Sequence, residues 1–425
     1  MKKLVFIIER SPYLKHFGSI IDEALKQNFP VECWALDGRS NGGSKAYTYL
    51  TPEKVPHFDH GQPKIVWFNS SEQMGGEASR TDILAAFATR KKYKTLGTTA
   101  TNFRYITIQV GIDTFVGATL DELLASDLIC VLSPFWLDWA ADYYTRSGES
   151  RAREKLQEKM IFTGFPFIDG ASQVKKLELR KKFGIPKNKN VVLLLPITLK
   201  NKRGAWSKFF SATSPVLRSA ILVHGGLTES QNYRQYIPWI TRGWHDDRLN
   251  HSIRAFCDAN NGWLVAKGRL KDPVRPSLQK ISDQFIYDDE DYPATILQLM
   301  SIASVCIHFY STAALELAYL GVPGICIDRP SPVFPNQEWP PLFHQLWRLN
   351  QPNTAYNWPG VNSWLSLPDA FTQLASLKLA QIPIDHLEQT KYIQTYIDQE
   401  YQLSNSSGNQ SSAKRILDSV TTLQV

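Results

Sequence analysis

Short apolar runs alternate with amphipathic stretches along most of this chain. The first three segments show the pattern. Leu4–Ile8 is rich in β-branched and apolar residues, Phe17–Gln27 has helical periodicity, and Val31–Leu36 is again strand-like. Strands that alternate with helices in this way form parallel sheets with helices on both faces. The sequence therefore predicts an α/β protein.

The alternation continues over the rest of the chain, with an interruption at the polar stretch Gly170–Lys176. The further strands that it predicts are Ile65–Phe68, Tyr105–Gln109, Leu128–Leu132, Val191–Leu195, Trp263–Ala266, Val305–Phe309 and Gly324–Asp328. The further helices are Ser79–Lys92, Leu120–Ala125, Phe135–Tyr144, Leu177–Phe183, Asp246–Ala259, Thr295–Ser301, Ala313–Leu320, Leu387–Gln402 and Ala413–Thr421. The segment Pro330–Pro368 is rich in Pro and Trp and is interpreted as irregular.

A length of 425 residues suits two domains better than one. We place the boundary at the interruption. Residues 1–172 and 173–385 are then two Rossmann-like domains facing across a cleft, because ligands of such sheets bind outside the carboxyl ends of the strands. Residues 386–425 are expected to form a C-terminal helical segment that packs back towards the first domain.

The formal net charge of +7 and the pI near 9.0 favour anionic partners, such as nucleotide diphosphates, acidic glycans or a phospholipid surface. Nucleic acid is not expected, because Lys and Arg are scattered and no nucleic-acid-binding signature occurs. The sequence also lacks the patterns GxGxxG, GxxxxGK(S/T) and HExxH. This argues against a nicotinamide-dependent enzyme, a phosphate-loop NTPase and an HExxH metalloprotease.

Five cysteines, an odd number, are present, and no two form a CxxC pair. Most lie in apolar runs, which predicts buried reduced thiols and a reducing compartment. The N-terminal run Leu4–Ile8 is too short for the core of a secretory signal, and no apolar run reaches the length of a membrane span. We therefore expect a cytoplasmic protein, with peripheral contact at the inner membrane surface left open.

One segment could make such a contact. Leu199–Phe210 contains four cations and three aromatic residues. This composition suits a membrane surface or an anionic acceptor, and it equally suits a solvated loop with anchoring rings.

The most informative stretch follows the predicted strand Val305–Phe309. Ser311 and Thr312 lie where a helix begins, and the free amides and positive end of a helix favour a phosphate group. Glu316 lies about one turn further, placed to accept hydrogen bonds from a ribose diol, and Gly321 ends the helix. The alternative is that Ser311 only caps the helix and Glu316 is a solvated acid of its first turn.

A second candidate for phosphate binding lies upstream. The predicted strand Trp263–Ala266 is followed by Lys267, Gly268 and Arg269. Two cations at the carboxyl edge of a parallel sheet, with a glycine that allows close approach, suit a diphosphate. The alternative is a solvated strand end.

Together these pieces resemble the glycosyltransferase-B superfamily. Three motifs carry the resemblance: Thr163-Gly-x-Pro166-x-x-Asp169, Lys267-Gly-Arg269 and Ser311-Thr-x-x-x-Glu316-x-x-x-x-Gly321-x-Pro323. In addition, Ile106-Thr-Ile-Gln-Val-Gly111 is similar to the family's strand ending in Gln-His-Gly, and the tail Gly408–Leu417 is similar to the family's terminal helix. Within the superfamily the chain is most similar to capsule and surface-polysaccharide transferases, CDP-glycerol glycerophosphotransferases and UDP-N-acetylglucosamine 2-epimerases.

The resemblance implies that the first domain takes an acceptor and the second binds a nucleotide-activated donor. Lys267, Arg269, Ser311 and Thr312 would hold the donor phosphates, and Glu316 the ribose. The implied function is a glycosyltransferase that moves a sugar or polyol phosphate from a nucleotide-activated donor to a surface polysaccharide or glycolipid acceptor. Two alternatives stay open: a nucleotide-sugar 2-epimerase, and a catalytically silent relative that binds a glycan or nucleotide.

The catalytic base is not given by the motifs. Val110 replaces the His of Gln-His-Gly, and the segment around Lys267 stands where many relatives have Lys-x-His-Pro, so no catalytic histidine is carried over. An inverting transfer needs a group that accepts the proton of the acceptor hydroxyl. The first candidate is His16, just after the first strand, although it could be an ordinary polar residue near a helix start. The rival candidates are Glu72, Asp113 and His224.

A metal is not expected. Asp289-Glu-Asp291 imitates an Asp-x-Asp metal motif, but Tyr292-Pro293 and a helical run follow it directly. We interpret it as an acidic helix start. The phosphate charge would be met by the helix end and the cations, and no cofactor is expected besides the nucleotide-activated substrate.

Overall fold

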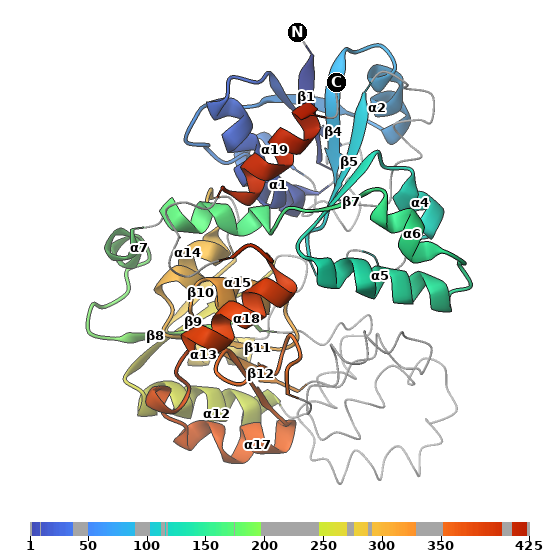
Figure 1. Cartoon of the computed structure of the whole chain (residues 1–425). Coiled ribbons are helices and arrows are strands. Elements are labelled where there is room, and N and C mark those ends of the chain that lie inside the picture. Colours follow the sequence, from blue (N-terminus) through green and yellow to red (C-terminus); the bar gives the residue numbers. More distant parts are fainter. Residues whose placement is uncertain are drawn as a thin grey trace, which may run out of the picture. The chain divides into compact units, whose positions relative to one another are not determined.

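The computed structural model describes most of the chain. The described residues are 2–8, 10–36, 50–89, 103–111, 115, 118–173, 175–196, 246–269, 276–287, 291–328, 352–401 and 410–422. The chain divides into two compact units, and each is described by itself (Figure 1). Unit 1 is Met1–Val174, Asp288–Gln298 and Thr390–Val425, and unit 2 is Lys175–Tyr287 and Leu299–Gln389. The predicted second domain, residues 173–385, includes Asp288–Gln298, whereas the backbone contacts group this segment with unit 1.

In the described part of unit 1, seven strands form one parallel sheet with the order β3-β2-β1-β4-β5-β6-β7. Its elements are β1 (Lys3–Ile8), α1 (Ser11–Lys26), β2 (Val31–Leu36), η2 (Pro52–Lys54), β3 (Lys64–Phe68), α2 (Ser71–Ala78), β4 (Ile83–Ala88), β5 (Arg104–Ile108), α4 (Leu120–Leu124), β6 (Leu128–Val131), α5 (Pro134–Arg146), α6 (Ala152–Gln157), β7 (Met160–Phe162), η3 (Pro166–Gln173) and α19 (Ser412–Thr422).

Strand β1 shows why this sheet needs helices on both faces. Leu4 and Phe6 point into a core that includes the apolar residues of α1 and α19. Val5 and Ile7 point the other way, into a second core that includes Met74 of α2. A strand buried on both faces reads as a continuous apolar run, which is what the sequence has here. The terminal helix α19 lies beside α1 (Figure 1).

In the described part of unit 2, six strands form a second parallel sheet with the order β10-β9-β8-β11-β12-β13. Its elements are α7 (Lys176–Lys182), β8 (Asn190–Leu194), α12 (Asp246–Ala259), β9 (Gly262–Lys267), α13 (Pro276–Ile281), β10 (Gln284–Ile286), β11 (Val305–His308), α15 (Ala313–Tyr319), β12 (Gly324–Ile327), β13 (Asn362–Leu365), α17 (Leu367–Thr372), η5 (Leu374–Ser376) and η6 (Leu379–Gln381). Helices α14 (Thr295–Ile302) and α18 (His386–Tyr396) each begin in one unit and end in the other.

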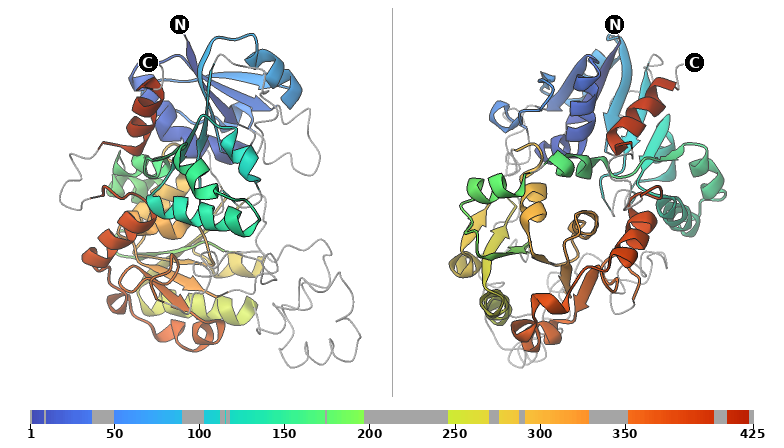
Figure 2. Two further views of the ribbon diagram at one scale, coloured as in Figure 1. Left: turned by 45° about the vertical axis from the view of Figure 1, so that its right-hand side comes forward. Right: turned by 60° about the vertical axis from the view of Figure 1, so that its left-hand side comes forward.

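The two faces of the second sheet differ in chemistry. Val305 and Ile307 of β11 face an apolar core that α12, α13 and α17 cover, and Figure 2 shows α12 and α17 next to one another on this side. Side chains alternate along a strand, so Cys306 and His308 point to the opposite face. Both are fully buried. The second face of this sheet therefore carries buried polar side chains.

The predicted architecture of two parallel α/β sheets is confirmed, as is the prediction of buried free thiols for all five cysteines. The predicted helix Ser79–Lys92 is wrong, because Ile83–Ala88 is the fully buried strand β4. Strand β13 lies inside the segment interpreted as irregular. Among the described helices, none is both long and apolar enough to cross a membrane.

Candidate functional site

The strand order of unit 2 reverses between β8 and β11. From β8 the chain adds β9 and β10 on one side, and then returns to add β11, β12 and β13 on the other. In sheets of this kind, ligands bind outside the carboxyl ends of the strands at the point of reversal. Ser311 and Thr312 follow β11, and Lys267 is the last residue of β9. The strands are parallel, so these residues belong to the same edge of the sheet.

The connection from β11 to α15 is tight. Ser311 and Thr312 are the two residues before Ala313, where the helix begins, and both are half-buried. The Ser311 hydroxyl oxygen accepts a hydrogen bond from the backbone N–H of Ala313 at 3.3 Å. This bond belongs to the turn before the helix; the N-cap residue of α15 is Thr312, which makes no side-chain capping hydrogen bond within the described residues. The bond to Ala313 fixes the position of the Ser311 hydroxyl, whose own hydrogen is not used in it.

Glu316 is more deeply placed than a solvated helix acid. The residue is 7% exposed. Burial raises the pKa of the Cys306 thiol well above its usual value, and the charge of Glu316 adds to this effect. Glu316 therefore lies near Cys306, on the polar face of the sheet. The alternative of a solvated first-turn acid is wrong, and ribose binding by Glu316 stays a prediction. Gly321, at φ 66°, follows the helix end, as predicted.

Lys267 is buried at 5% exposure. Its ammonium group donates hydrogen bonds to the carbonyl oxygens of Gly268 at 3.1 Å and of Tyr287 at 3.3 Å. The charge is therefore engaged by the ends of β9 and β10. Lys267 would have to exchange one of these carbonyls for a phosphate oxygen, or act on the phosphate through space.

Arg269, two residues further, is exposed. The glycine between the two cations, Gly268, is required by packing within the unit. A Cβ at this position would lie 2.8 Å from ring atoms of Phe285 and Tyr287, so only glycine fits against these rings. Of the two cations, Arg269 is the one that solvent, and hence a ligand, reaches directly.

Tyr310 and Asp328 lie at the same edge of the sheet, and no sequence motif pointed to them. Tyr310, just before Ser311, has φ 53°, and its hydroxyl donates a hydrogen bond to Asp328, which follows β12. The position of Asp328 directly after a buried strand is the signal that could have drawn attention to it.

The polar face of the sheet holds a group of polar atoms that lack partners among the described residues: both ring nitrogens of His308, and Oδ1 of Asn362. They surround Gly324, since a Cβ there would lie 2.2 Å from the Asn362 oxygen and 3.3 Å from His308 Nε2. Burial lowers the pKa of His308 to about 3, so the ring is neutral at neutral pH.

In unit 1, His16 lies in α1, one to two turns after its start. Its ring packs on Phe167 with centroids 5.2 Å apart, and no described group pairs with its Nδ1. Burial, with a smaller effect of Lys15, lowers the pKa of His16 to about 3. A general base works best with a pKa near the working pH. His16 in this environment is a weak base, and its catalytic role stays a prediction.

The rival candidates are dispersed. Glu72 is exposed in the first turn of α2, which follows β3, the outermost strand of the first sheet. It thus stands two strands away from β1, whose end precedes His16. Asp113 and His224 lie outside the described residues, as does the segment Leu199–Phe210.

The strand that resembles the family's Gln-His-Gly keeps its glutamine in a structural role. The side-chain oxygen of Gln109 accepts a hydrogen bond from the backbone N–H of Leu132 at 3.1 Å, and its amide donates to the carbonyl of Gly111 at 3.3 Å. Gln109 is 1% exposed. It ties the end of β5 to the end of β6 and orients the turn at Val110.

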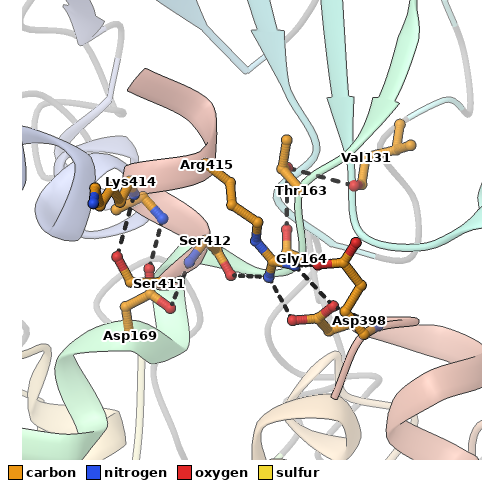
Figure 3. A network of polar contacts seen from close by, with 11 residues as sticks. Val131, Thr163, Gly164, Asp169, Asp398, Ser411, Ser412, Lys414 and Arg415 are labelled. Atoms are coloured by element: carbon orange, nitrogen blue, oxygen red, sulfur yellow. Dashed lines mark hydrogen bonds and ion pairs between the residues drawn. The ribbon is translucent and has the colours of Figure 1, made fainter. Parts of the chain in front are cut away.

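Two of the motifs that resemble the family, Thr163–Asp169 and the C-terminal tail, are hydrogen-bonded to each other. Asp169 accepts hydrogen bonds from the backbone N–H groups of Ser412 at 3.3 Å and Ala413 at 2.7 Å, at the start of α19 (Figure 3). Arg415 forms an ion pair with Asp398, close to Gly164. The contacts of the motif Thr163–Asp169 therefore fix the C-terminal helix α19 to the rest of unit 1.

Asp291 belongs to a helix start, as interpreted from the sequence. Its carboxylate accepts a hydrogen bond from the hydroxyl of Thr295, the first residue of α14, at 3.0 Å. Asp289 lies outside the described residues. Within the described ranges, no group of three or more His, Cys, Asp or Glu side chains is arranged to hold a metal ion.

No family model matches the chain, and no curated protein matches it. Solved structures do. The wall teichoic acid polymerase TagF is 14% identical with a TM-score of 0.52, over 99% of this chain and 88% of that chain. A putative UDP-N-acetylglucosamine 2-epimerase from Listeria monocytogenes is 10% identical with a TM-score of 0.51, over 100% of this chain and 97% of that chain. A further UDP-N-acetylglucosamine 2-epimerase is 11% identical with a TM-score of 0.52, over 100% and 96%.

These likenesses run over nearly the whole chain at identities that establish architecture and not activity. Together with the two parallel sheets, they show that the chain has the two-domain fold of the glycosyltransferase-B superfamily.

Proposed function

We propose that this protein is a transferase that moves a sugar or polyol phosphate from a nucleotide-activated donor to a hydroxyl of a surface polysaccharide, such as a capsule, or of a glycolipid. The observation that carries the proposal is the edge of the second sheet where the strand order reverses. Ser311 and Thr312 lie there between β11 and α15, and Arg269 follows β9 at the same edge. Hydroxyl groups and a guanidinium suit phosphate oxygens.

The proposed chemistry asks one main thing of these residues. The acceptor hydroxyl oxygen bonds to the sugar carbon or to the phosphorus of the polyol phosphate, and its proton passes to a base. At the same time the bond to the nucleotide breaks, and negative charge develops on the departing phosphate. Donors that are already in place at that phosphate lower the barrier, because they need not reorganise. Ser311, whose hydroxyl oxygen is fixed by the N–H of Ala313, meets this requirement. Arg269 would supply the positive charge.

The polymerase named above supports the polyol-phosphate form of the donor, because one of its structures was soaked with CDPG and shares the fold with a TM-score of 0.52. The acceptor would be a glycan or glycolipid. Such acceptors are often held at a membrane, so we include peripheral contact with the cytoplasmic face of the membrane in the proposal. The net charge of +7 suits an anionic surface.

A second candidate function is epimerisation of a nucleotide sugar. It is favoured by the two epimerases above, whose chains are matched over 97% and 96% of their lengths. An epimerase needs acid and base groups around the sugar ring. His16, whose pKa is lowered to about 3, and Glu72, which follows the outermost strand, stand two strands apart in the sheet and do not form such a set. A transfer, in contrast, needs only one base. We therefore rank the transferase first.

The test has two steps. Thermal unfolding is first measured with CMP, CDP, UDP, GDP and ADP, and the transferase proposal predicts a rise in the unfolding temperature with one base and not with the others. The protein is then incubated with the matching nucleotide sugar or CDP-glycerol, with and without a glycan acceptor. Product that forms only with acceptor supports the transferase. A new sugar epimer without acceptor supports the epimerase, and binding without any turnover supports a catalytically silent relative.

A further inference from the structure

Tyr310, the residue before Ser311, has an uncommon backbone conformation. Among the described residues other than glycine, positive φ occurs at Asn28, Arg151, Asn261, Tyr310 and Asn353. Asparagine tolerates this region, because its short side chain can hydrogen-bond to the local backbone. Tyr310 is the aromatic member of the set, and its φ of 53° is unfavourable for so bulky a side chain. Such a conformation persists only where the surroundings hold it.

The side chain of Tyr310 supplies that hold. Its hydroxyl donates a hydrogen bond to Oδ1 of Asp328, and its ring packs edge-on against Tyr356 with centroids 5.6 Å apart. Asp328 is itself fixed, since its backbone N–H donates to the carbonyl of Leu365 in β13 at 2.9 Å. The phenol is thus anchored to the two strands that follow β11 in the sheet. Burial, followed by the charge of Asp328, raises the pKa of Tyr310, so the phenol stays protonated and remains a donor.

This anchor controls the direction of the chain at the carboxyl edge of the second sheet, directly after β11. Tyr310 stands between His308, the last residue of β11, and Ser311, so its φ and ψ set where the Ser311 hydroxyl and the first N–H groups of α15 point. If Tyr310 relaxed to negative φ, the chain would leave the strand in another direction. The hydrogen bond from Ala313 to the Ser311 hydroxyl could then not form as it does.

We infer that Tyr310 and Asp328 are positioning residues for nucleotide binding. Their hydrogen bond keeps the backbone of Tyr310 in the left-handed conformation and thereby holds Ser311 and Thr312 in the orientation that binds the donor phosphates. This inference rests on the proposed function of that edge. A glycine at position 310 would adopt the same φ without strain, but it would also leave it freely. The tyrosine combines the required φ with a side-chain anchor, which reduces the conformational freedom that a ligand would otherwise have to remove.

The test measures affinity for CDP and UDP by titration calorimetry on the full chain. The variants are Tyr310→Phe, which keeps the ring and removes the hydroxyl, Asp328→Ala, which removes the acceptor, the double variant, and Asp328→Asn, which keeps an acceptor oxygen. Tyr143→Phe, on α5 in unit 1, is the matched control for loss of a tyrosine hydroxyl. Circular dichroism verifies that each variant is folded at the temperature of the titration.

We expect Tyr310→Phe and Asp328→Ala each to weaken nucleotide binding by about tenfold, the typical effect of losing one hydrogen bond to a charged group. The double variant should be no weaker than either single one, because both changes remove the same bond. Asp328→Asn should recover most of the affinity, and Tyr143→Phe should leave it unchanged. Recovery by Asn separates positioning from a general loss of packing.

Two results would overturn the inference, and they differ. If the unchanged protein binds CDP or UDP and Tyr310→Phe binds it equally well, the inference fails while the proposed function stands. If the unchanged protein binds none of the nucleotides in the panel, the proposed function fails, and the role of Tyr310 in nucleotide binding falls with it.

Discussion

The carboxylate of Asp169 accepts a hydrogen bond from the backbone N–H of Ala413 at 2.7 Å, and so joins two motifs that are 244 positions apart in the sequence. Both motifs contributed to the resemblance, and in unit 1 they act on each other: one caps the helix that the other forms. A motif shared with a family of enzymes can therefore reflect the requirements of the fold rather than of the chemistry.

This capping contact can be tested through stability. Asp169→Ala removes the acceptor for the N–H groups of Ser412 and Ala413, and should lower the free energy of unfolding by about 1–3 kcal/mol. Burial raises the pKa of Asp169 to about 7, so urea titrations at pH 5 and at pH 8 compare the variants with the carboxyl neutral and ionised. The exposed Glu158→Ala is the control and should change stability little. Equal stability of Asp169→Ala and the unchanged protein would show that the cap is dispensable.

Gly324 offers a test of close packing within the second sheet. In Gly324→Ala the new Cβ would lie 2.2 Å from Oδ1 of Asn362, so β12 or β13 has to shift. We expect a loss of about 1–3 kcal/mol in the free energy of unfolding. The matched control is Gly76→Ala in α2, where a Cβ meets nothing within 4 Å. That change should stabilise by about 0.5–1 kcal/mol, because alanine favours the helix. Similar effects of the two substitutions would contradict the packing described for Gly324.

His308 should make stability depend on pH. The folded protein holds this ring neutral, with a pKa lowered from 6.5 to about 3 by burial, whereas the unfolded chain binds a proton below pH 6.5. The unfolded state therefore binds more protons between these values, and stability falls as the pH falls from 6.5 towards 3. The contribution of this group is about 1.4 kcal/mol per pH unit.

The measurement for His308 is the difference in unfolding free energy between the unchanged protein and His308→Gln from pH 8 to pH 4. The difference should be constant above pH 7. Below pH 6.5 it should move in favour of the variant, because glutamine does not titrate. A difference that stays flat over the whole range would mean that His308 is protonated as readily in the folded protein as in the unfolded chain.

The sequence predicted the sheets well where a strand is buried on both faces and is clearly bounded. Strand Val31–Leu36 has the predicted limits, and so does the amphipathic helix Asp246–Ala259. Ile83–Ala88 was mistaken for part of a helix, because a short apolar run rich in alanine lacks the alternation that marks a half-buried strand. Asn362–Leu365 was missed because its strand character comes from pairing with β12 and not from its own residues.

The candidate site divides in a similar way. Ser311, Thr312 and Arg269 could be proposed from local patterns, since strand ends and helix starts are visible in the sequence. The contact between Tyr310 and Asp328 could not, because it joins the ends of two neighbouring strands and depends on their register. The engagement of Lys267 with backbone carbonyls was likewise invisible, because the sequence does not show where a long side chain turns.

The proposed function requires that the carboxyl edge of the second sheet binds the phosphates of a nucleotide. The most direct measurement is the dissociation constant of the nucleotide that stabilises the protein most, determined by calorimetry for Ser311→Ala and Arg269→Ala. Ser79→Ala and Arg80→Ala in unit 1 serve as controls. We predict that each change at the edge weakens binding by about tenfold or more and that the controls bind normally. Unaltered affinity in folded Ser311→Ala and Arg269→Ala would mean that this edge does not bind the nucleotide phosphates.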